Sequence, residues 1–111
     1  MAQNDYFVIC YKILSYLYDC LKAGSEISRE YLQAESFNCP LSYWEYIICH
    51  LYDDGYIEGV QMIPILGQRR SYKLMPDIAI TPKGIEYLQN NSMMAKAKEC
   101  LKTIKDITPG L

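Results

Sequence analysis

This sequence lacks an excess of positive charge. Its 111 residues hold 11 Lys and Arg against 13 Asp and Glu, which gives a net charge of −2 and an isoelectric point near 5.3. No global positive field therefore draws the chain to nucleic acid or to an anionic membrane. Any such contact must come from a local patch of basic residues.

Metal-binding and catalytic motifs are also missing. The chain has a single histidine and an odd number of cysteines: Cys10, Cys20, Cys39, Cys49 and Cys100. The cysteines form no Cys-x-x-Cys pair, and with the histidine they do not have the spacing of a zinc site. Cys49 and His50 are neighbours, but adjacent residues on a helix point about 100° apart and cannot share a proton or a metal. There is no glycine-rich phosphate loop and no Ser/His/Asp set. We expect reduced thiols, no metal, no cofactor and no enzymatic activity.

Long apolar runs are absent as well. Residues 6–21 are rich in apolar side chains, but Lys12, Ser15 and Asp19 interrupt them before a membrane-spanning length is reached. Residues 1–5 carry no basic segment of the kind that opens a signal peptide. We expect no membrane contact and a cytoplasmic location.

The clearest local signal is a helix over residues 42–54. Ser42 and Glu45 have the spacing of a capping box, and Asp54-Gly55 provides a stop. The apolar residues recur at helical spacing and should be buried: Trp44, Ile47, Ile48 and Leu51. A polar and aromatic stripe should face the other way: Tyr43, Tyr46, His50 and Asp53. This is the pattern of the third helix of a winged helix-turn-helix.

The flanking segments complete that fold. Residues 5–23 have the period of a long amphipathic helix, with apolar positions at Phe7, Cys10, Leu14, Leu17 and Leu21. A short helix is expected from Arg29 to about Glu35. Residues 56–65 and 71–80 predict two strands around a turn at 66–70, which would form the wing. Pro64 and Pro76 should lie at edges or where pairing lapses.

The C-terminal third predicts two more helices. Thr81-Pro82 is an N-cap followed by proline at the first helical position, and this helix should stop near residues 89–91. Ser92 is expected to cap a final helix over 92–108. The sequence thus predicts an α+β fold: one winged helix-turn-helix domain over 1–111, with a two-stranded wing and an added C-terminal helix.

Three stretches resemble the YjcQ-like family of small winged-helix proteins from bacteria and their phages. They are Asp-Tyr-Phe-Val-Ile through Tyr-Leu-Tyr at 5–18, Asp-Gly-Tyr-Ile-Glu-Gly-Val at 54–60, and Ile-Thr-Pro-Lys-Gly-Ile-Glu-Tyr-Leu through Asn-Ser-Met-Met at 80–94. The resemblance implies a winged-helix fold and a phage or prophage setting. It brings no catalytic or ligand-binding residues, and DNA binding is inferred for the family mainly from its fold.

Two hypotheses of function follow. In the first, the protein is a DNA-binding transcriptional regulator: the helix over 42–54 reads double-stranded DNA and the wing lies on the flanking backbone. The candidate contact residues are Arg29, Tyr43, Tyr46, His50, Arg69, Arg70, Lys73 and Lys83. In the second, the chain is a protein-interaction module without DNA affinity, which presents its tyrosine-rich face to a host or phage protein. Asp53 and Asp54, which would repel phosphate, and the acidic net charge favour this alternative.

The last helix has a narrow apolar stripe on a lysine-rich surface. Its members are Met94, Ala97, Leu101 and Ile104. Such a stripe suffices for one helix contact, so this helix either pairs with its copy in a homodimer or packs on its own domain. Its lysines alternate with Glu99 and Asp106, which favours a solvated outer face.

Overall fold

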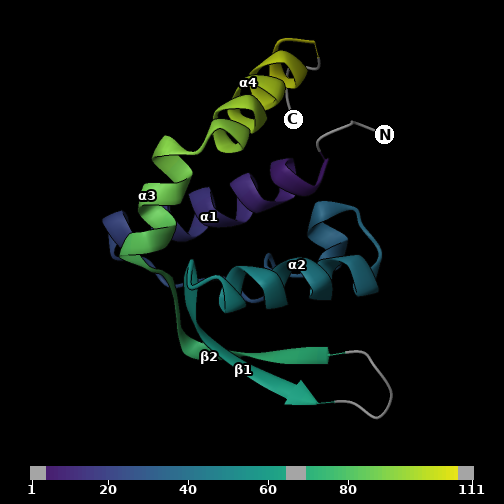
Figure 1. Cartoon of the computed structure of the whole chain (residues 1–111), viewed down its shortest axis with the longest axis vertical. Coiled ribbons are helices and arrows are strands. Elements are labelled where there is room, and N and C mark those ends of the chain that lie inside the picture. The colour runs from purple at the N-terminus through teal and green to yellow at the C-terminus, as the bar shows by residue number, and fades with distance from the viewer. Residues whose placement is uncertain (1–4, 65–69, 108–111) are drawn as a thin grey trace.

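The structure is a computed structural model that describes the backbone of residues 5–64 and 70–107 and the side chains through Lys102. The elements follow the order α1 (Asp5–Ala23), the 3-10 helix η1 (Ala34–Phe37), α2 (Leu41–Asp53), β1 (Ile57–Pro64), β2 (Arg70–Ile80), α3 (Pro82–Asn90) and α4 (Ser92–Ile107). Figure 1 shows α1 between the α4 side and the α2 side, with the two strands beneath α2. This α+β arrangement is consistent with a winged helix that carries an added C-terminal helix.

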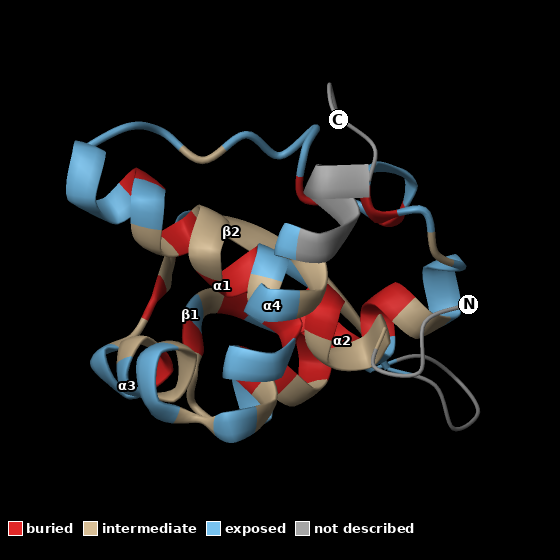
Figure 2. Cartoon of the chain, turned by 90° about the horizontal axis from the view of Figure 1, so that it is seen from above, coloured by how far each residue is buried: buried red, intermediate tan, exposed pale blue. Residues whose placement is uncertain are grey.

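The helix α1 is the centre of the domain. It contacts α2, α3, α4 and β2, and its inner face is buried through Cys10, Ile13, Leu14 and Leu17. Figure 2 shows that the buried segments gather where the helices and the sheet meet. The prediction for Leu21 was wrong, because its side chain is 52% exposed. The residues from 21 to 26 are all exposed, so the last turn of α1 extends beyond the elements that cover the helix.

The predicted helix from Arg29 to Glu35 does not form. The chain instead turns along α1, where the Ser28 N–H donates to the Tyr16 hydroxyl at 2.8 Å, and then makes the 3-10 turn η1. The Ser28 hydroxyl accepts from the Tyr31 N–H at 3.2 Å, as in a helix N-cap, and the Leu32 N–H donates to the Ser28 carbonyl at 3.2 Å, so one helical turn forms but is not continued. Burial of Leu32 and Phe37 holds this segment against the core.

The helix α2 has the predicted buried stripe, but its start was mispredicted. Trp44, Ile47 and Ile48 are almost completely buried. The N-cap is Pro40, with no side-chain cap, and the helix begins at Leu41. The predicted capping box fails at its first member, because Ser42 lies inside the helix and is not its N-cap; the Oε2 of Glu45 accepts from the Ser71 hydroxyl on β2.

The wing is an antiparallel pair with an irregular register. Glu58 lies opposite Ala79 and Val60 opposite Leu74, so β2 has extra residues at this point. Pro76 falls among them, which confirms that it lies where pairing lapses. Pro64 ends β1 opposite Arg70. The predicted turn over 66–70 lies outside the described residues except for Arg70, which begins β2.

The junction of β2 with α3 is capped as predicted. The Thr81 hydroxyl accepts from the Gly84 N–H at 3.0 Å and donates to the Gly55 carbonyl at 2.6 Å, which connects the start of α3 to the end of α2. For α4 the predicted cap was displaced by one residue. Asn91, not Ser92, accepts the N–H groups of Met93 and Met94. No helix in the described ranges is long and apolar enough to cross a membrane.

Candidate nucleic-acid interface

The exposed face of α2 is made by residues at i, i+4 and i+8. Ser42 and Tyr46 are exposed and His50 is half-buried, with the Tyr46 and His50 ring centroids 4.2 Å apart. Tyr46 is the most open of the candidate aromatic residues, at 55% exposure. Because α2 has no side-chain cap, its first N–H groups add the partial positive charge of a helix N-terminus to this face. We call Ser42, Tyr46 and His50 the α2 face.

Tyr43 does not belong to the α2 face. Its hydroxyl donates to the Asp5 carboxylate at 3.0 Å, so its half-buried side chain is directed at the start of α1. Burial, and then the neighbouring Asp5 carboxylate, raises the pKa of Tyr43 to about 12. The helical spacing of Tyr43 and Tyr46 suggested a common stripe, but α1 covers one edge of that stripe.

Arg70 lies beside α2 and not in an open turn. Its guanidinium forms a 2.8 Å ion pair with the Asp53 carboxylate, and the two side chains are 43% and 40% exposed. The hydrogen bond that Arg70 donates to the Asp53 carboxylate raises the pKa of Arg70. The carboxylate of Asp53 therefore offsets the positive charge of Arg70, which the sequence predicted for the wing tip. Arg69 lies outside the described residues.

Polar contacts from α2 to β2 hold the wing in place. Glu45 is buried, and its Oε2 accepts from the Ser71 hydroxyl at 2.8 Å. The Trp44 Nε1–H donates to the hydroxyl of Tyr72. We call Glu45, Asp53 and their partners on β2 the wing junction. Sequence reasoning missed it, although Glu45, Cys49 and Asp53 recur every four residues and mark one helix face.

The other candidate cations lie on β2, on α3 and in the segment that follows α1. Lys73 is exposed on β2 opposite Gln61. Lys83 is exposed on α3, with its Nζ 5.6 Å from the centroid of the Tyr56 ring, which stacks on Tyr87. Arg29 is exposed in the segment that follows α1. Among the candidate cations that the structure describes, Arg70 forms an ion pair with α2.

The apolar stripe of α4 is directed into the domain. Met94 and Ala97 are fully buried, and α4 packs along α1. Leu101 is half-buried beside α1, and the side chain of Ile104 lies outside the described residues. Of the two alternatives for this helix, packing on its own domain therefore holds for Met94 and Ala97.

Within the described residues, no group of three or more His, Cys, Asp or Glu side chains could hold a metal ion. The cysteines are free, and burial raises the pKa of Cys10 to about 12 from 9.0. The buried Cys10 thiol is therefore a poor nucleophile.

Comparison with known proteins identifies one family. A family model described as YjcQ protein matches residues 11–107, from the first helix to the end of the last. No curated protein and no solved structure matches the chain. The match extends over most of the sequence, from within α1 to the end of α4, and the chain belongs to the YjcQ protein family.

Proposed function

We propose that this protein is a winged-helix DNA-binding protein that acts as a transcriptional regulator of phage or prophage type. The observation that carries the proposal is the α2 face, a row of exposed and half-buried hydrogen-bonding side chains on the helix that occupies the recognition position of the fold. Tyrosine and serine hydroxyls and a histidine ring can contact both phosphates and base edges.

The helix N-terminus supports contact with the DNA backbone. The first turn of α2 has no side-chain cap, and Leu41 and Ser42 are exposed beside it. Free N–H groups at a helix N-terminus bind anions, phosphates included. This end of α2 gives the interface positive potential that the net charge of −2 does not reveal.

The wing supplies the flanking contacts in this proposal. Lys73 is exposed on β2, and Arg70 keeps donors beyond those that Asp53 can accept, since a guanidinium carries five N–H groups. These remaining donors can contact a phosphate at the edge of α2, while the Asp53 carboxylate offsets part of the guanidinium's positive charge. Lys83 and Arg29 remain candidates for more distant phosphate contacts.

A second function is supported by Tyr46 of the α2 face together with the acidic C-terminal end of α2. The exposed Tyr46 ring and the acidic pair Asp53 and Asp54 resemble a surface for a protein partner, because aromatic side chains are enriched in interfaces and acids repel DNA. A protein of the phage or of its host would then be the partner.

The two functions are separated by titrating a labelled mixed-sequence duplex with the protein at low and moderate salt, by fluorescence anisotropy. The DNA-binding proposal expects micromolar affinity that weakens steeply with salt. Tyr46→Ala and Lys73→Ala should each weaken binding about three- to tenfold. Lys96→Ala, which removes one exposed lysine from α4, is the matched control and should bind like the unmodified protein.

An absence of duplex binding at low salt refutes the DNA-binding proposal and leaves the protein-interaction function. Equal losses from Lys73→Ala and Lys96→Ala also contradict it, because binding would then follow total charge and not the wing.

A further inference from the structure

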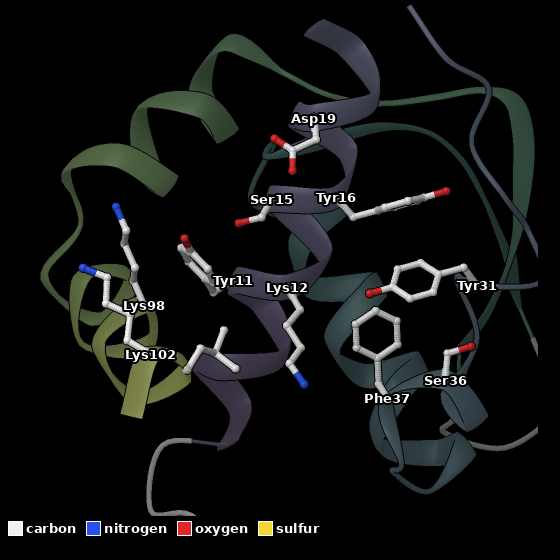
Figure 3. Close-up of a pocket in the computed structure, with 11 residues that line it drawn as sticks. Tyr11, Lys12, Ser15, Tyr16, Asp19, Tyr31, Ser36, Phe37, Lys98 and Lys102 are labelled. Carbon is white, nitrogen blue, oxygen red and sulfur yellow. The ribbon is translucent and has the colours of Figure 1, made fainter. Parts of the chain in front are cut away.

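A groove runs along the outer side of α1, away from the interface just described. Its volume is about 670 Å³. The floor is α1, α4 forms one wall, and the segment that contains η1 forms the other. Figure 3 shows Tyr16, Tyr31 and Phe37 together on one side and Lys98 and Lys102 on the other, with Lys12 between them. We call this the α1 groove.

The α1 groove is positive on a protein that is acidic as a whole. Lys12, Lys98 and Lys102 line it, and Asp19 is the one acidic residue among its described lining residues. Lys12 and Lys98 form no ion pair within the described part of the chain. Lys102 pairs with Glu99 at 3.7 Å, but both side chains are largely exposed, so this pair is weak. The groove therefore attracts an anionic partner.

The apolar part of the groove determines what kind of anion fits. Leu101 and Tyr11 are half-buried beside it, and Phe37 is a buried residue of the η1 wall. The Tyr16 and Tyr31 rings already pack on one another, with centroids 4.6 Å apart, and the Tyr16 hydroxyl accepts the Ser28 N–H. These rings present less free face for stacking bases than a single-strand nucleic-acid groove requires. Apolar side chains can still pack on their edges and on Leu101.

A second hollow of about 600 Å³ extends the groove along α1. It shares Tyr11, Ser15, Asp19 and Lys98 with the first and continues to Leu88 on α3. The surface thus follows the axis of α1 with half-buried apolar side chains in it, and the second hollow adds one lysine, Lys22, and one acidic residue, Glu99. The excess of lysines lies in the first hollow. An extended groove of this kind fits an amphipathic helix.

We propose that the α1 groove binds an acidic amphipathic helix of a partner protein, with apolar side chains against Leu101 and Tyr11 and carboxylates beside Lys12 and Lys98. This inference goes beyond the proposed DNA-binding function and does not depend on it, since none of the groove residues belongs to the α2 face or the wing junction.

The test uses a labelled peptide of about 18 residues, long enough for an isolated helix, with leucines along one face and glutamates flanking them. A second peptide has lysines in place of the glutamates, and a third has the same composition in scrambled order. Saturable binding of the first peptide alone is expected. The double variant Lys12→Glu/Lys98→Glu should weaken it about tenfold or more, because two attractions become repulsions.

Lys96→Glu is the matched control, because it reverses an exposed lysine on α4 that does not line the groove. Binding of the peptide to this variant should be unchanged. Circular dichroism of the double variant should match the unmodified protein, since Lys12 and Lys98 are exposed.

Three results overturn the proposal. The first is no saturable binding of the acidic peptide at low salt, or equal binding of the scrambled or basic peptide. The second is an equal loss with Lys96→Glu. The third is another occupant, shown either by displacement of the peptide with single-stranded oligothymidylate or by a dimer in light scattering that the double variant abolishes. Duplex binding by the double variant, measured separately, tests the DNA-binding proposal alone.

Discussion

Substitution of Gly84 with alanine tests how α3 is seated on the domain. An added Cβ would lie 2.2 Å from the Tyr56 carbonyl oxygen and 2.8 Å from Cγ1 of Ile80. The oxygen belongs to the backbone and accepts the Thr81 N–H at 3.0 Å, so no side-chain rotation relieves the overlap. The substitution must displace α3 and disturb the hydrogen bond at its start.

The expected change in the free energy of unfolding follows from two opposing effects. Overpacking of a core typically costs about 1–3 kcal/mol, and contact with a backbone atom favours the upper part of that range. Alanine in place of glycine within a helix returns about 1 kcal/mol. We therefore expect Gly84→Ala to lower the free energy of unfolding by about 2 kcal/mol and the melting temperature by about 10 °C.

The assay is urea unfolding followed by fluorescence of Trp44, which is the only tryptophan and is fully buried. Gly24→Ala is the control, because Gly24 has a left-handed φ of 68° and no atom within 4 Å of an added Cβ. Its cost, about 1 kcal/mol, is backbone strain alone. A Gly84→Ala protein as stable as the unmodified chain would refute the reasoning, since helix propensity would then outweigh the contact.

Three further perturbations probe the cap, the wing junction and the tyrosines. Thr81→Ala should lower the free energy of unfolding by about 1–2 kcal/mol, while Thr81→Ser should keep most of the stability because it keeps the hydroxyl. Equal losses of stability in denaturant titrations would contradict a stabilising role for the two hydrogen bonds. Asp53→Asn should tighten duplex binding about threefold by freeing the Arg70 charge, and weaker binding in anisotropy titrations would show that Asp53 instead positions Arg70. Tyr43 and Tyr87 have pKa values raised from 10.0 to about 12, so the unfolded tyrosines ionise first and stability should fall between pH 10 and pH 12. Tyrosinate absorbance and unfolding curves measure this, and a free energy of unfolding that does not change over the range would exclude it.

Part of the candidate site could be predicted from the sequence, and part could not. Exposure of Tyr46 follows from its position opposite the Trp44 stripe, and helical spacing alone indicates it. By the same spacing Tyr43 should lie on the side of Tyr46, but its hydroxyl donates to the Asp5 carboxylate at the start of α1. The site was therefore narrower than the sequence pattern indicated.

The sequence likewise predicted the charge of the wing only in part. The sequence places Arg69 and Arg70 together in a turn, yet Arg70 begins a strand and pairs with Asp53 on α2. Glu45 looked like a capping residue, and its partner is Ser71, 26 residues away. No local pattern reveals such partners, because they depend on where α2 and β2 meet.

The sequence by itself determined the elements whose physics is local. Amphipathic periods predicted α1 and α2, the Thr81-Pro82 pair predicted the start of α3, and the proline at position 76 predicted the lapse in strand pairing. These features depend on residues within a few positions of one another.

Only the tertiary structure decided which faces stay open. It buried Met94 and Ala97 of α4 against the domain, joined Arg70 to Asp53, and left the α1 groove between α4 and η1. An amphipathic period shows that a helix has an apolar face but not which element covers it. Burial of that face depends on packing between segments far apart in the chain.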